Sequence, residues 1–180
     1  MCGSSKKGFQ VRSFGSGNQV KLPGPSPDRP NVYDFGTTYD QMYTDLKNKD
    51  CSLYPSIPPL SYTQNGILHM LDRNRRIKAH PERFQACADR FDVIFTAEER
   101  VFDQVVEELQ SREPVDNTPV HIINVDIQDN HEEATIGAIM IYELARRIQD
   151  SDDLDNDIDD ILQEFEARNN RSVLHAIQFY

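Results

Sequence analysis

The chain has 180 residues and a formal net charge of −11, a length that suits one domain with a sizeable core. So acidic a protein would repel a phosphate backbone, and we therefore expect no direct binding to nucleic acid. No run approaches the roughly 20 apolar residues that span a bilayer, and three irregularly spaced cysteines argue against a disulfide framework, so we expect a soluble intracellular protein that binds no membrane.

In the first half of the chain, short periodic segments alternate with proline-rich connections. The elements predicted there are, in chain order, a strand over 10–14, a proline-rich connection over 22–30, a helix capped by Thr37 or Thr38 and continuing to about Asn48, a segment without regular structure over 51–60, a helix over 65–77 and a short helix over 81–88.

The second half repeats a unit in which a strand is followed by a helix. Its predicted elements are a strand over 92–96, a helix over 97–111, a strand over 120–125, a helix to about residue 149, an acidic helix over 153–169 and an apolar run over 173–180. This repetition predicts an α/β fold with three layers, a mostly parallel sheet and right-handed crossovers.

The strongest functional signal lies between Val120 and Thr135, in the segment VHIINVDIQDNHEEAT. An apolar strand ends in two acids, Asp126 and Asp129, and leads directly into a helix. Ligands of open α/β sheets bind beyond the carboxyl ends of the strands, so these carboxylates are candidates for a general acid or base. A carboxylate that only caps the following helix is the alternative for Asp129.

Several segments between residues 6 and 180 match one family almost word for word: GFQVRSFGSG, VKLPGPSPDRPNVYDF, TYDQMY, TQNGILHMLDRNRRIK, PERFQAC, FDVIFT, EERVFDQVVEEL and PVHIINVDIQDNHEEATIGA. They resemble the eukaryotic Ssu72 phosphatases. The resemblance implies one phosphatase-like domain over 6–180, similar in fold to low-molecular-weight tyrosine phosphatases. It also implies a nuclear enzyme that removes phosphate from serine in the heptad repeats of the RNA polymerase II C-terminal domain (CTD). A symplekin-type scaffold of the cleavage and polyadenylation machinery is the implied protein partner, and no cofactor or metal is implied.

The resemblance also assigns roles to individual residues. Asp129 matches the general acid that protonates the leaving serine oxygen, and Asp126 matches a nearby supporting acid. Lys21, Pro23 and Met70 match positions that line the groove for the substrate peptide. For Met70, ordinary packing of a helix against the core explains the sequence equally well.

The sequence departs from the family pattern in two places. The family's nucleophile loop has the form C-x-x-x-x-x-R, in which a thiolate attacks phosphorus while the arginine and backbone amides hold its oxygens. Cys2, Cys51 and Cys87 are followed six positions later by Gly, Ile and Val, so none has the required arginine. We therefore expect the family's first strand and nucleophile loop to be missing, with an atypical segment at 1–5, and the chain to be inactive. A proline-rich insertion at 55–62 is the second departure.

The acids of 153–164 have the spacing of a calcium-binding loop, but Ile158 stands where that loop needs glycine, so a helix is favoured. Three functions stay open at this point: a CTD phosphatase represented by an altered chain, a protein that binds the scaffold without catalysis, and a generic α/β protein that binds a small ligand.

Overall fold

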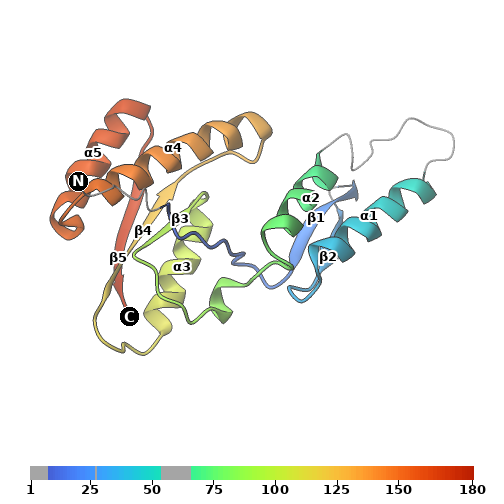
Figure 1. Cartoon of the computed structure of the whole chain (residues 1–180), viewed down its shortest axis with the longest axis horizontal. Coiled ribbons are helices and arrows are strands. Elements are labelled where there is room, and N and C mark those ends of the chain that lie inside the picture. The colour runs from blue at the N-terminus through green and yellow to red at the C-terminus, as the bar shows by residue number, and fades with distance from the viewer. Residues whose placement is uncertain (1–7, 27, 54–65) are drawn as a thin grey trace, which may run out of the picture. The chain divides into compact units, whose positions relative to one another are not determined.

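A computed structural model of the chain describes residues 8–26, 28–53 and 66–180. The described residues belong to two compact units, 1–87 and 88–180, and each unit is considered by itself (Figure 1). The single domain predicted over 6–180 stays a prediction. The atypical segment 1–5 and the insertion 55–62 both lie outside the described residues.

The first unit contains an antiparallel strand pair and helices. Its elements are β1 (Val20–Ser26), β2 (Arg29–Tyr33), α1 (Tyr39–Leu53), α2 (Ile67–Ile77) and the short 3-10 helix η1 (Phe84–Ala86). Its core is formed by buried side chains from β1, α1 and α2, namely Leu22, Met42, Leu46, Ile67, Leu68 and Leu71. The two longer helices confirm the predictions from apolar periodicity, whereas the predicted short helix is reduced to one 3-10 turn.

The start of α1 is a capping box. The backbone N–H of Gln41 donates to Oγ1 of Thr38 at 3.1 Å, and the backbone N–H of Thr38 donates to Oε1 of Gln41 at 2.9 Å. Two backbone donors that a helix start leaves unpaired are thereby satisfied. Of the two candidate caps, Thr38 is the one that the structure uses.

Three predictions for this unit are wrong. Residues 10–14 form no strand; the chain pairs only at Gly15, through one isolated bridge to Arg83. Residues 22–30 fall largely within β1 and β2, where side-chain alternation is hidden by proline and glycine. Helix α1 continues through Leu53, because the first proline of the 51–60 segment comes only at Pro55.

The second unit contains a three-stranded sheet in the order β3 (Val93–Thr96), β4 (Pro119–Val125) and β5 (Val173–Phe179). Three helices accompany it: α3 (Glu99–Ser111), α4 (His131–Asp150) and α5 (Leu154–Asn169). The strands β3 and β4 and the three helices confirm the elements predicted for this half, and the segment 153–164 is helical rather than a calcium-binding loop. The apolar run at 173–180, for which the sequence predicts no element type, forms β5.

Helices cover both faces of this sheet. Ile123 and Val125 of β4 pack into one buried cluster with side chains of α4 and α5. Val120 and Ile122 alternate with them and point to the opposite face, and α3 contacts both β4 and β5 (Figure 1). The α/β class is confirmed. The sheet itself is mixed, because β3 and β4 run parallel while β4 and β5 run antiparallel.

No helix in the described part of the chain is both long and apolar enough to cross a membrane.

Candidate functional site

The two predicted acids lie in one short loop at the carboxyl end of β4. Every residue from Val120 to Val125 is buried, whereas Asp126 and Asp129 are exposed. Both carboxylates are therefore open to a ligand at the edge of the sheet where ligands of α/β folds bind. The structure brings this pair together as the sequence predicts.

The start of this loop, which we call the acid loop (126–130), is anchored through Ile127. Its backbone N–H donates to the carbonyl oxygen of Ala97 at 3.0 Å, which ties the loop to the end of the neighbouring strand β3. Its side chain fits against Gly137 of α4, where an added Cβ would lie 2.3 Å from the Ile127 Cδ1. Only glycine leaves room for this contact.

The end of the acid loop is fixed by the cap of α4. Oδ1 of Asn130 accepts the backbone N–H of Glu133 at 2.9 Å, and the Asn130 carbonyl oxygen accepts the N–H of Ala134 at 2.9 Å. Asn130 is thus the N-cap, and the alternative that Asp129 caps the helix is wrong.

A residue that sequence analysis missed contacts the first residue of this loop and the first turn of the helix that follows it. Nη1 of Arg171 donates to the carbonyl oxygen of Asp126 at 3.2 Å, and Nη2 donates to Oε2 of Glu133 at 2.7 Å. Arg171 lies between α5 and β5, and 45 residues separate it from Asp126. No local pattern in the sequence joins positions so far apart.

The predicted groove residues belong to the first unit. Lys21 and Pro23 are exposed on β1, on either side of the buried Leu22, and the Pro23 carbonyl oxygen accepts Nδ2 of Asn31 at 2.9 Å. Met70 on α2 is half-buried against the core. It therefore packs as a helix residue and also presents part of its side chain to solvent.

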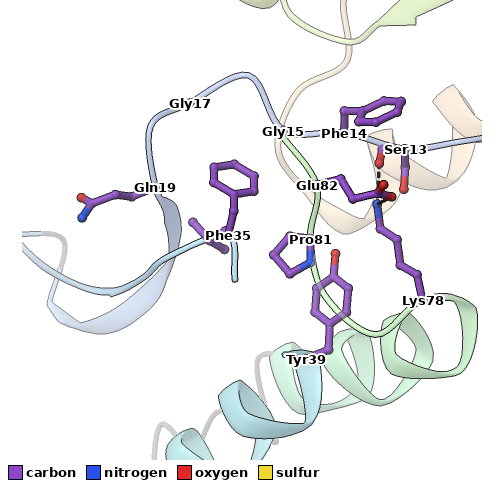
Figure 2. A pocket seen from close by; sticks show the side chains of 11 residues that line it. Ser13, Phe14, Gly15, Gly17, Gln19, Phe35, Tyr39, Lys78, Pro81 and Glu82 are labelled. Carbon is purple, nitrogen blue, oxygen red and sulfur yellow. Dashed lines mark hydrogen bonds and ion pairs between the residues drawn. The ribbon is translucent and has the colours of Figure 1, made fainter. Parts of the chain in front are cut away.

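A cavity of about 250 Å³ in the first unit contains none of these three residues. Figure 2 shows Phe35, Tyr39 and Pro81 around it, with Lys78 bonded to Glu82 at 3.1 Å and to the carbonyl oxygen of Ser13. Burial, and secondly the Glu82 carboxylate, raise the pKa of Tyr39. The two charged side chains of the cavity, Lys78 and Glu82, thus bind each other.

The cysteines do not supply a nucleophile loop within the described part of the chain. Cys87 is a half-buried free thiol that ends η1, and Val93 occupies the position where the motif requires arginine. The same part of the chain brings together no three side chains that could hold a metal ion.

Comparison with known proteins decides the family. The family model described as "Ssu72-like protein" matches residues 4–180. The chain belongs to the Ssu72 family. It is 64% identical to SSU72, the human phosphatase of the RNA polymerase II C-terminal domain, over 98% of this chain and 87% of that protein. The zebrafish protein of the same name is 62% identical over the same shares, and the human SSU72 like protein 3 is 53% identical over 97% of this chain and 86% of that protein.

Solved structures of Ssu72 proteins have the same fold. A Drosophila melanogaster Ssu72 with symplekin and a cis peptidomimetic CTD phosphoserine peptide has 53% identity and a TM-score of 0.87, over 96% of this chain and 85% of that chain. A second Drosophila melanogaster structure, described as the serine phosphatase of the RNA polymerase II CTD, has 55% identity and a TM-score of 0.89, over 97% of this chain and 88% of that chain.

Proposed function

We propose that this protein is a phosphatase of the RNA polymerase II CTD that acts on phosphoserine. The observation that carries the proposal is 64% identity to a human CTD phosphatase, extending over 98% of the chain. The exposed carboxylates at the carboxyl end of β4 fit this chemistry, because ligands of α/β folds bind at that end of the strands.

In this proposal Asp129 is the general acid and Asp126 is a supporting acid. A serine alkoxide is a poor leaving group and needs a proton as the phosphorus–oxygen bond breaks. Asp129 is exposed, as Asp126 is, and Asn130 rather than Asp129 caps α4, so the Asp129 carboxylate is not used as the helix cap. Asp126 lies next to the buried end of β4, and its backbone carbonyl oxygen is bound by Arg171.

The family reaction is cysteine-dependent, and the 180 residues contain no C-x-x-x-x-x-R motif. A thiolate nucleophile needs donors that hold the phosphate oxygens, and none of the three cysteines has the arginine that would provide them. We propose that these 180 residues alone do not hydrolyse phosphate esters. A chain in which the family's nucleophile strand and loop replace residues 1–5, here called the extended chain, would do so.

The substrate peptide is proposed to lie along the exposed side of β1. Lys21 offers a cation for phosphate, and Pro23 and the exposed part of Met70 offer apolar contacts for proline. The Drosophila relative was solved with a cis peptidomimetic CTD phosphoserine peptide, a ligand of this chemistry.

A second candidate function is scaffold binding without catalysis. The same Drosophila structure contains symplekin, so a symplekin-like scaffold and the nuclear 3′-end processing machinery are the proposed partners here. This function requires folded helices but no nucleophile.

Phosphate release from a CTD heptad peptide carrying phosphoserine tests the proposal. We expect release by the extended chain and none by the 180-residue chain. Release by the 180-residue chain that is lost when Cys2, Cys51 or Cys87 is changed to Ser would refute the proposed inactivity. No release by a folded extended chain would refute the phosphatase assignment.

A further inference from the structure

Arg171 occupies a fixed position beside the acid loop. Helix α5 ends at Asn169, and Asn170 follows in the left-handed conformation with φ 51°, which turns the chain sharply before β5 begins at Val173. The turn places Arg171 where its two terminal nitrogens reach different segments of the chain.

The two contacts of Arg171 lie at opposite ends of the acid loop. The carbonyl oxygen of Asp126 belongs to the first residue of the loop, and Glu133 lies in the first turn of α4, just after the last. A planar guanidinium with several donors can bridge two such acceptors, whereas the ammonium of a lysine is a compact point charge on a flexible stem. One side chain therefore fixes the distance between the two ends of the segment that carries Asp129.

This bridge is partly shielded from water. The side chains of Arg171 and Glu133 are 31% and 23% exposed, so their ion pair is screened less than one on the open surface. The other anchors of the loop, Ile127 and Asn130, each hold one end only.

We propose that Arg171 is a positioning residue that holds Asp129 in line with the leaving group by fixing both ends of the acid loop. This inference rests on the proposed function of Asp129 as general acid. It goes beyond that function because Arg171 bonds to the backbone of Asp126 and to Glu133, and so acts on Asp129 through the loop.

Kinetics of the extended chain on two substrates separate positioning from general stabilisation. A phosphoserine peptide needs a proton on its leaving group, whereas p-nitrophenyl phosphate, which releases a stable phenolate, needs little protonation. We expect Arg171→Ala to lower kcat about tenfold for the peptide. It should change kcat by less than about twofold for p-nitrophenyl phosphate, and Arg171→Lys should restore part of the loss.

Arg147 provides the matched control. It bonds Glu164 at 3.1 Å between α4 and α5 and is 27% exposed, and this bond does not involve the acid loop. Arg147→Ala should affect both substrates alike. If Arg171→Ala also affects both substrates alike, or neither, the positioning proposal is wrong.

A second measurement separates failure of this proposal from failure of the proposed function. In the 180-residue chain, amide hydrogen exchange at Ile127 and Asn130 should become about tenfold faster in Arg171→Ala and stay unchanged in Arg147→Ala. An inactive extended chain with this faster exchange would overturn the phosphatase assignment and retain the role of Arg171 in holding the loop. Unchanged exchange in Arg171→Ala would overturn the positioning proposal whatever the activity.

Discussion

Nδ1 of His121 and Nε2 of His175 lie 3.1 Å apart, in two nearly parallel rings that belong to the neighbouring strands β4 and β5. The other nitrogen of His121, Nε2, lies 3.0 Å from Oδ1 of Asp155 on α5. Because an ionised carboxylate can only accept, a neutral His121 that donates from Nε2 to Asp155 would accept at Nδ1 from His175. The chain of bonds thus joins two strands and a helix.

This pair predicts that acid weakens the fold. Burial, and secondly His121, lower the pKa of His175 below its ordinary 6.5, and Asp159 opposes them. The acidic groups near the two histidines are Asp155 and Asp159 on α5. His121 and His175 themselves are the titratable side chains of β4 and β5. The unfolded chain binds a proton more readily than the folded one below about pH 6.5, so the free energy of unfolding falls as the pH drops below that value.

Urea unfolding between pH 5 and 8 measures this effect. We expect the unfolding free energy to change less steeply with pH in His175→Gln than in the parent. The difference in slope should correspond to less than one bound proton. His131→Gln, which replaces an exposed histidine at the start of α4, provides the comparison variant. An equal slope in His175→Gln and the parent would contradict the prediction.

The contact between Gly137 and Ile127 predicts a stability change. In Gly137→Ala the new methyl group would meet the Ile127 side chain at 2.3 Å and displace it. Overpacking costs about 1–3 kcal/mol, and the better helix propensity of alanine offsets up to about 1 kcal/mol, so we expect a net loss of about 1 kcal/mol. Chemical unfolding measures it. In an Ile127→Ala background the same substitution should no longer destabilise, and equal losses in both backgrounds would exclude the contact as the cause.

The two acids should differ in kinetic effect. In the extended chain, Asp129→Asn should lower kcat on a phosphoserine peptide about 100-fold or more, because an amide cannot donate the proton that a serine alkoxide needs. Asp126→Asn should cost less. Steady-state kinetics of both variants measures the difference, and the acid assignment moves to Asp126 if its variant loses activity while Asp129→Asn keeps it.

Scaffold binding should depend less than catalysis on the nucleophile loop. We expect a symplekin-type scaffold to retain the 180-residue chain in a pull-down, although more weakly than the extended chain, because the strand added in the extended chain would pair with a sheet edge and support the packing of its helices. Absence of binding by the 180-residue chain beside strong binding by the extended chain would exclude the non-catalytic scaffold function.

The sequence predicts the second unit more completely than the first, for a physical reason. Strands and helices of the second unit have clear periodicities, so the acid loop could be placed between β4 and α4. In the first unit, Pro23, Gly24 and Pro25 conceal β1. The register of the β1–β2 pair shifts between Leu22 and Ser26, and the two prolines and the glycine lie within this irregular stretch. A proline there has no N–H to donate, but no regular hydrogen bond of the strand pair is lost.

Two further features were beyond the reach of sequence patterns. The sequence predicts no element type for the apolar run 173–180, so both the strand β5 and its antiparallel pairing with β4 needed the structure. The bridge from Arg171 to the acid loop joins residues 45 positions apart, and such contacts leave no periodic signal. Local patterns did identify Asp126 and Asp129, because β4, the acid loop and α4 follow one another directly in the sequence.

The late position of Arg171 has a consequence for synthesis of the protein. During translation Asp126 and Asp129 leave the ribosome well before α5 and Arg171, which must emerge before the bridge can form. A nascent chain that has reached only α4 therefore carries both acids in a loop held by Ile127 and Asn130 alone. The acid loop gains its third anchor only when Arg171 has been added and has emerged.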